Sequence, residues 1–284
     1  MKEKKARHIA LRLYNLISPL KGWVILSIVC MAGYNIFTAA PAYYAKDIVG
    51  EHLYVGSYLA LGILTIIPTI FFLFYKNTSK LESNIKYSGR SRLVLISQPR
   101  FLQALVASAF GYAIMTFLMT ATPLSMHVME KMSLSKTGLV IQFHVVAMFL
   151  PSLVTGYLIK KFGHSNIMYA GVFLYSITIS ASFFDQTFFN YMFALIFLGL
   201  GWNFLFISGT SLLVLTYKEE EKFRAQGLND FIVYSVHAIG SLSAGVLIAL
   251  TNWKTMNIIC IPLMVLIILT TLRAEILSKK NTNN

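Results

Sequence analysis

The sequence is too apolar for a soluble globular protein, because 56% of its 284 residues are hydrophobic and only 12% are charged. It predicts an integral membrane protein of the all-α class, since lipid satisfies backbone polar groups only in helices or closed barrels. The formal net charge of +13 does not indicate nucleic acid binding, because the basic residues lie between the apolar runs.

Residues 1–21 are basic and predict a cytoplasmic tail. Eight apolar runs follow, each close to the ~20 residues that a membrane-spanning helix needs. The runs cover residues 22–44, 55–75, 101–122, 138–159, 167–184, 190–213, 230–250 and 256–272. The first run exceeds the length of a signal-peptide core, so we interpret it as a membrane span.

The long polar segment 76–100 predicts a cytoplasmic loop between a two-helix unit at 22–75 and a six-helix unit at 101–272. Residues 273–284 form a second tail. Twenty of the 24 Lys and Arg residues fall on the side of the two tails, and the other four are Lys46, Lys131, Lys136 and Lys254. This asymmetry predicts that both termini are cytoplasmic.

Prolines and small residues inside the runs predict details of the helices. Pro68, Pro151 and Pro262 should bend or open them. Small residues let helix backbones approach closely in a membrane. Those expected to do so are Gly199 and Gly201 in the sixth run, and Ala238, Ser241 and Gly245 in the seventh.

The turn after the fourth run reads GYLIKKFGH at 156–164. It resembles the cytoplasmic gating signature G-x-L-x-D-R-x-G-R of the major facilitator superfamily. Gly156, Leu158 and Gly163 match that signature, and Lys161 stands for its first arginine. Lys160 replaces the acid, so the acid's role in locking one conformation does not carry over.

Three further segments resemble helices ten and eleven of bacterial permeases of this superfamily: GWNFLF at 201–206, GTSLL at 209–213 and AQGLNDF at 225–231. Fitted in this way, 101–272 is the C-terminal six-helix half and 22–75 are helices five and six, so the family's first four helices have no counterpart. The resemblance implies a secondary active transporter that moves a small molecule across the inner membrane by alternating access, commonly driven by protons.

Polar side chains near or inside the spans are candidates for substrate or proton binding, because such groups are costly in lipid unless they are paired or face a cavity. They are Gln142, His144, Asn203, Asn229, Asp230 and His237. Asp230 and His237 lie seven residues apart and share a helix face, which suits a proton relay. Alternatively, Asn229 and Asp230 cap a helix. Arg224 is the expected cytoplasmic partner of Asp230, and we group it with the gating signature.

The histidines and Asn203 have a second interpretation, in which they hydrogen-bond neighbouring helices. Gln142 and His144 are two residues apart, so at most one should face a cavity. The candidates for lining a cavity are Asn35, Tyr112, Thr116, Thr120 and Thr210, of which the three in the third run recur at every fourth residue. That stripe faces away from lipid, toward either solvent or protein.

Catalytic, metal-binding and phosphate-loop motifs are absent from the sequence, so we predict no enzyme, no metal and no cofactor. The expected partners are the lipid bilayer, an unidentified small-molecule substrate, and either a separate N-terminal helix bundle or a second copy of the chain. We expect the chain to be inactive without one of these last two. A non-transporting scaffold, or the remnant of a split permease gene, is the alternative function, and a membrane-embedded enzyme is the third.

Overall fold

The computed structural model describes Ile66 and residues 89–282. The chain divides into two units, residues 1–81 and 82–284, and the account below concerns the second. The spans predicted at 22–44 and 55–75, the candidate Asn35 and most of the loop predicted at 76–100 lie outside the described residues.

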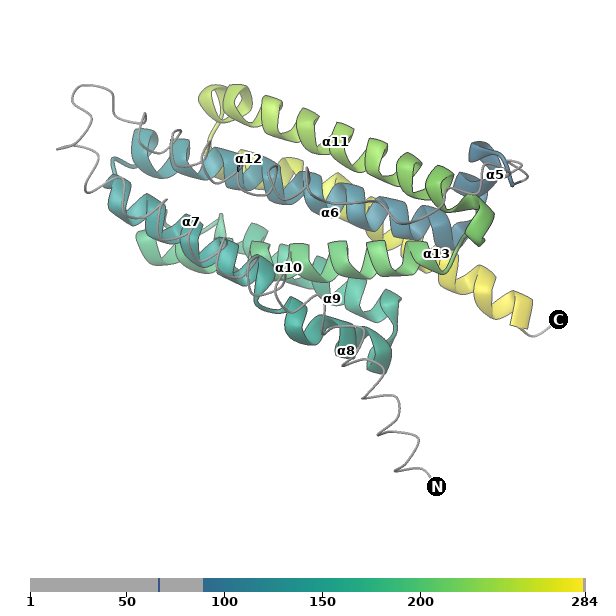
Figure 1. The fold of residues 1–284 in the computed structure, drawn as a ribbon. Coiled ribbons are helices and arrows are strands. Elements are labelled where there is room, and N and C mark those ends of the chain that lie inside the picture. Colours follow the sequence, from purple (N-terminus) through teal and green to yellow (C-terminus); the bar gives the residue numbers. More distant parts are fainter. Residues whose placement is uncertain (1–65, 67–88, 283–284) are drawn as a thin grey trace. The chain divides into compact units, whose positions relative to one another are not determined.

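The described part contains helices joined by short turns and no strand, which confirms the predicted all-α class. Its helices are α5 Arg92–Ser97, α6 Pro99–Pro123, α7 Leu134–Phe149, α8 Ser152–Phe162, α9 His164–Ala181, α10 Phe188–Val214, α11 Lys222–Leu250, α12 Trp253–Ile259 and α13 Ile261–Thr282 (Figure 1). A π-helical turn, Leu124–Met129, extends α6, and a 3₁₀ turn, Glu219–Glu221, precedes α11.

Within the described residues, four helical stretches each contain an apolar segment long enough to cross a membrane: Pro99–Met129, Phe188–Val214, Glu219–Leu250 and Trp253–Lys280. A fifth span arises if α7 and α8 are counted together, and the two helices meet at an angle of 42°. The bend lies at Pro151, as the sequence predicted, and the break between α12 and α13 lies beside Pro262. The predicted span 167–184 corresponds to α9, which has 18 residues and a polar first turn, and which is not among these spans.

Three element boundaries differ most from the prediction. Helix α13 continues to Thr282, through most of the segment predicted as a C-terminal tail. The end of the expected 76–100 loop forms α5, because Ser91 caps it through a bond from the Val94 N–H to Ser91 Oγ and because Leu95 is buried. Helix α11 begins at Lys222, well before residue 230, so the polar segment that precedes the apolar run is also helical.

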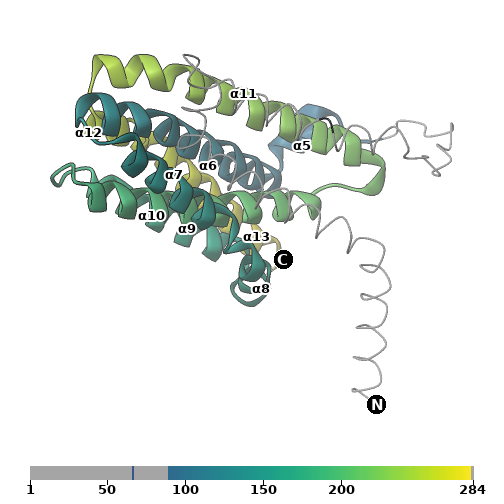
Figure 2. The same ribbon diagram turned by 60° about the vertical axis from the view of Figure 1, so that its left-hand side comes forward.

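Helix α6 forms the centre of the described bundle, with α11 on one side and α10 on the other in both views (Figures 1 and 2). In the 18-residue apolar segment of the span that contains α6, 83% of the residues are buried. In the corresponding segment of the span that contains α11, only 17% are buried. The core therefore surrounds α6, and α11 leaves most of its surface open in the described structure.

Glycines of α10 bring three neighbouring helices into backbone contact. A Cβ atom at Gly199 would lie 2.7 Å from the His144 carbonyl oxygen of α7, and one at Gly201 would lie 2.5 Å from the Tyr175 ring of α9. A Cβ atom at Gly209 would lie 2.8 Å from the Ala104 carbonyl oxygen of α6. The close approach predicted at Gly199 and Gly201 is confirmed. It is wrong for Gly245, which has no neighbour within 4 Å in the described structure.

An ion pair ties the chain before α5 to the turn between α10 and α11. Arg90 donates from Nε and Nη2 to the Glu221 carboxylate at 2.7 and 2.6 Å. The backbone N–H groups of Arg90 and Lys218 also donate to that carboxylate, and Glu221 is only 2% exposed. Arg224 donates to the Gly89 and Arg90 carbonyls. The hydrogen bond from the Arg90 guanidinium, supported by the backbone N–H groups, holds the pKa of Glu221 well below its usual range.

The substitution Gly199→Ala should lower the midpoint of thermal unfolding, because its new methyl group would press on the backbone of α7. Overpacking of this kind costs about 1–3 kcal/mol. The matched control is Gly245→Ala, which adds the same methyl group in open space on α11. Unfolding in detergent, followed by tryptophan fluorescence, checks this. Equal midpoints for the two variants would contradict the proposed packing of α10.

The substitution Glu221→Gln should also lower the unfolding midpoint at pH 7, because Arg90 loses its charged partner. Since the folded-state pKa of Glu221 is lowered, its stabilisation is fully present above the unfolded value of about 4.3 and is lost as the pH falls below it. The difference from the wild type should therefore persist down to about pH 5 and shrink at more acidic pH. The neighbouring Glu219, whose side chain is 86% exposed, provides the control Glu219→Gln, which should have little effect at any pH.

Candidate functional site

Five ring side chains from four helices form what we call the aromatic cluster: Tyr112 of α6, Phe149 of α7, Trp202 and Phe206 of α10, and His237 of α11. The Trp202 and Phe206 rings are stacked, with centroids 5.0 Å apart and planes 10° from parallel. Tyr112 packs edge-on against Trp202, Phe206 and His237 at centroid distances of 5.5, 5.4 and 4.6 Å. Phe149 packs edge-on against Trp202 at 5.8 Å. The cluster therefore joins helices that are distant in the sequence.

A polar contact accompanies these rings at the interface of α6 and α11. Thr116 Oγ1 lies 2.7 Å from His237 Nδ1, and Tyr112, one helical turn before Thr116, lies edge-on to the same imidazole. Thr120 lies one further turn along α6 and is half-buried. The stripe of α6 predicted to avoid lipid thus faces α11 at Tyr112 and Thr116.

Asp230, Tyr234 and His237 follow one another along one face of α11, because they lie at positions i, i+4 and i+7. Asp230 is exposed, and Tyr234 is 59% exposed. The capping interpretation of Asn229 and Asp230 is wrong, because α11 begins at Lys222. Asn229 is buried and donates to Asp230 Oδ1 at 3.1 Å, which holds the carboxylate beside the interface with α6.

Arg224 does not pair with Asp230, because its guanidinium donates to the backbone before α5. Within the described residues, no ion pair involves Asp230. An exposed, unpaired carboxylate on an apolar helix indicates a face directed toward water or toward protein rather than lipid.

Asn203 is fully buried, and its side chain bonds only to neighbouring protein groups. Its Nδ2 donates to the Met148 carbonyl and to Ser152 Oγ, and its Oδ1 accepts from Thr155 Oγ1 at 2.6 Å. These partners lie on both sides of the α7–α8 bend, so Asn203 fixes that bend against α10. The geometry favours the interhelical alternative for Asn203, while Thr210 bonds to the Phe206 carbonyl of its own helix.

His144 is also fully buried, and its Nδ1–H donates to the Leu195 carbonyl of α10 at 2.7 Å. This bond again links α7 to α10. Gln142 is half-buried and lies on a different face of α7, as its spacing from His144 predicted. Among the described residues, no group of His, Cys, Asp and Glu side chains is arranged to hold a metal ion.

The signature-like turn lies at the end of α8. Gly163 has φ 85°, a conformation that favours glycine, and its N–H bonds to the Ile159 carbonyl, which ends the helix. Lys161 is exposed and lies over the Phe162 ring, while Gly156 is exposed and Leu158 half-buried.

The sequence analysis did not select Phe149, Trp202 or Phe206. The spacing of Trp202 and Phe206, one helical turn apart, was the available signal. Trp202 is 4% exposed, and its Nε1–H has no hydrogen-bond partner within the described structure. A buried donor without a partner is costly. Three other buried polar atoms of the described structure also lack a partner, namely His144 Nε2, Ser208 Oγ and Asn257 Oδ1, and none of them lies in the aromatic cluster.

Comparison with known proteins identifies the family. Residues 104–283 match the family model of the Major Facilitator Superfamily. The chain is 36% identical over 229 residues to the riboflavin transporter RfnT of Brucella anthropi. The aligned region covers 79% of this chain and 57% of that protein. It is 30% identical over 185 residues to the uncharacterized MFS-type transporter YddS of Bacillus subtilis, covering 64% of this chain and 42% of the relative.

The relative YdeG of Bacillus subtilis, also an uncharacterized MFS-type transporter, is 34% identical over 148 residues, covering 51% of this chain and 34% of the relative. The chain spans about half the length of the curated relatives it matches. The family model covers more than half of the chain, and it includes all five residues of the aromatic cluster. The chain is therefore a multi-pass membrane protein of the major facilitator superfamily.

Proposed function

We propose that this chain takes part in moving a planar heteroaromatic compound of the flavin class across the inner membrane by alternating access, with both termini in the cytoplasm. Family membership supports transport as the activity, and no enzymatic reaction is proposed. The similarity to a riboflavin transporter supports the substrate class. The observation that carries the proposal is the aromatic cluster, because its rings and its free donor suit such a substrate.

A flat ring system gains from stacking on aromatic side chains, by about 0.5–1.5 kcal/mol for each pair beyond the burial of area. Trp202 and Phe206 provide stacked faces, and Tyr112 and His237 provide edges. Phe149 is 44% exposed and packs on Trp202, so a rotation of its side chain would open the indole. The unpartnered Trp202 Nε1–H would then donate to a ring carbonyl of the substrate.

The proposed coupling site for protons is the polar face of α11. His237 contacts Thr116, and Asp230 lies two helical turns away on the same face with an exposed carboxylate. His237 belongs to the aromatic cluster, and Asp230 lies on the same helix, α11. Protonation there would alter the hydrogen bonds of the ring cluster directly, which links substrate binding to proton binding.

We propose a second helix bundle, either an N-terminal half or another copy of the chain, as the partner that completes the cavity. Alternating access requires two bundles around a central site. The open surface of α11 carries Asp230 among exposed apolar residues such as Phe231 and Leu242, which are 71% and 80% exposed. The alternative is a non-transporting scaffold, which would bind no substrate at the cluster.

Riboflavin should bind to the purified chain with quenching of its fluorescence. The substitution Trp202→Phe should weaken this binding about tenfold, because one hydrogen bond of about 1.4 kcal/mol is lost. Phe206→Leu should weaken it through the loss of stacking. Trp253→Phe is the matched control, since Trp253 is equally buried but packs on Tyr191, outside the cluster. Absence of binding to the wild type would favour the scaffold alternative, and equal effects of both tryptophan variants would contradict the assigned site.

The affinity of the wild type for riboflavin should change between about pH 5.5 and 8, a range in which histidine commonly titrates. In His237→Gln, which keeps a hydrogen-bonding side chain, the change should disappear while binding itself remains. His127→Gln provides the control, because His127 is exposed on the turn after α6 and bonds to the Met132 carbonyl. A pH dependence that survives His237→Gln would remove this residue from the coupling mechanism.

A further inference from the structure

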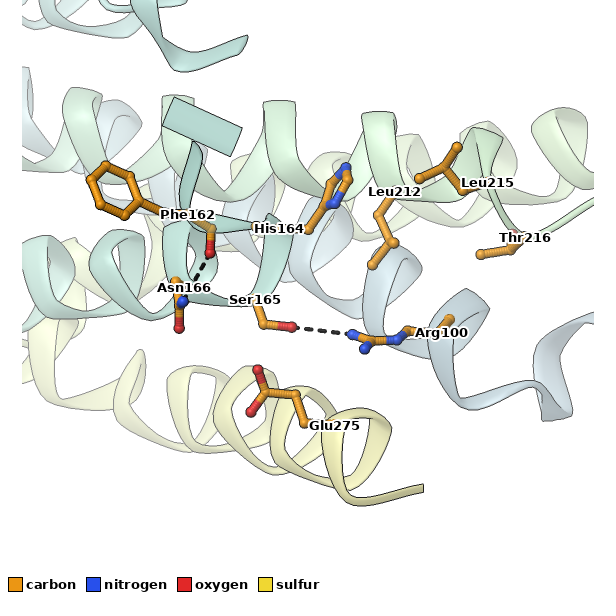
Figure 3. Close-up of a pocket in the computed structure, with 10 residues that line it drawn as sticks. Arg100, Phe162, His164, Ser165, Asn166, Leu212, Leu215, Thr216 and Glu275 are labelled. Atoms are coloured by element: carbon orange, nitrogen blue, oxygen red, sulfur yellow. Dashed lines mark hydrogen bonds between the residues drawn. The ribbon is translucent and has the colours of Figure 1, made fainter. Parts of the chain in front are cut away.

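A polar pocket lies apart from the aromatic cluster (Figure 3). It is formed where α6 and α9 begin and where α8 and α10 end, beside the last turns of α13. Its volume is about 460 Å³. Polar and charged side chains line it, among them Arg100, His164, Asn166 and Glu275. Gly163 and His164, the last two residues of the signature-like turn, border the pocket, and the proposed substrate site does not account for a charged cavity at this position.

Arg100 is held in place on one side only. Its Nη1 donates to Gln103 Oε1 at 2.9 Å and to Ser165 Oγ at 3.2 Å, and Gln103 Nε2 also donates to Ser165. Gln103 is fully buried and Ser165 nearly so. No ion pair within the described structure includes Arg100. The guanidinium is therefore positioned in advance, with its remaining N–H groups and its charge available to a ligand.

A carboxylate from a different helix lines the same pocket. Figure 3 shows Glu275 of α13 facing the start of α9, while Arg100 reaches Ser165 from α6. Glu275 Oε2 accepts a hydrogen bond from Tyr169 at 3.3 Å, and it does not pair with Arg100. The pocket thus offers a fixed cation and a fixed anion that do not neutralise each other by direct contact.

The start of α9 adds a third element to the pocket. Gly163 precedes the helix and gives no side-chain cap to its first N–H groups. His164 and Asn166, both in the first turn, line the cavity close to Arg100. Free N–H groups at a helix N-terminus favour an anion, so the Arg100 side of the pocket suits a phosphate group. Glu275 suits an ammonium group.

Apolar side chains border these charges. Leu215 and Phe162 line the pocket and are 71% and 49% exposed, respectively. The pocket also lies at the ends of membrane-crossing helices, where the polar headgroups of a bilayer lie. A polar cavity with an exposed apolar border fits an amphipathic ligand better than a fully polar one.

We propose that this pocket binds the headgroup of a zwitterionic phospholipid, with the phosphate against Arg100 and the start of α9 and the ammonium against Glu275. An anionic lipid, or free phosphate, would meet the uncompensated carboxylate of Glu275. The bound headgroup joins α6, α9 and α13, so it stabilises the bundle independently of any transported substrate.

The test uses the purified full chain in detergent, with thermal unfolding measured after addition of a short-chain lipid. Dioctanoyl phosphatidylethanolamine should raise the unfolding midpoint by several degrees, and phosphatidylglycerol of the same chain length should raise it much less. Arg100→Gln and Glu275→Gln should each remove the advantage of phosphatidylethanolamine, each variant being compared with its own lipid-free midpoint.

The control variants change equivalent charges outside the pocket. Arg273→Gln lies on exposed α13 surface, and Glu130→Gln is exposed on the turn after α6; both should keep the lipid response of the wild type. If Arg100→Gln does not fold, Arg100→Lys serves instead, because it keeps the charge but loses the planar fork and should retain only part of the response. Retention of lipid in native mass spectrometry gives a second readout.

Three results would overturn the proposal. Equal stabilisation by phosphatidylglycerol would mean that Glu275 does not select an ammonium. Stabilisation by inorganic phosphate alone would assign the pocket to a free anion. Absence of stabilisation by any of these, with no phosphatidylethanolamine retained in native mass spectrometry, would mean that the pocket holds only water.

Discussion

The close approach of backbones along α10 determines how α6, α7 and α9 are arranged around it. Its glycines contact α7, α9 and α6 on three sides, and a side chain at any of them would have to displace a neighbouring helix backbone or a buried tyrosine ring. In lipid, where the hydrophobic effect does not drive helices together, such packing and interhelical hydrogen bonds supply the association energy. The remaining face of α10, which bears Trp202 and Phe206, is the face left for the aromatic cluster. The geometry of the cluster therefore depends on glycines that do not belong to it.

Polar groups inside the bundle serve two different purposes. Asn203 and His144 have their hydrogen bonds directed at neighbouring helices, which fixes the α7–α8 bend and the contact of α7 with α10. Asp230 and the Trp202 Nε1–H have no comparable protein partner across the bundle within the described residues. The hydrogen-bonded groups hold the helices together. The exposed Asp230 carboxylate and the buried Trp202 Nε1 and His144 Nε2 leave hydrogen-bonding capacity unused within the described structure.

Much of the described fold could be predicted from the sequence, because membrane helices follow from apolar length and prolines mark their bends. The α7–α8 break at Pro151 and the close contacts of Gly199 and Gly201 are examples. The start of α11 could not be predicted in this way, since its first turns are polar and lie outside the apolar run. The aromatic cluster could not be predicted either, because Tyr112, Trp202 and His237 meet only after three helices have packed. The expectation for Asn203 remained open until its partners Ser152 and Thr155 were known, because hydrogen bonds between helices leave no periodic signal.

Trp202 and Asn203 are adjacent in the sequence but belong to different parts of the structure. Successive helical residues point about 100° apart, so Trp202 enters the aromatic cluster while Asn203 holds α10 against the bend of α7 and α8. A substitution that changes only the rings of the cluster therefore leaves the hydrogen bonds of Asn203 with Met148, Ser152 and Thr155 in place. A lineage of such proteins can therefore vary the rings on one face of α10 while the adjacent face keeps the bend of α7 and α8 in place.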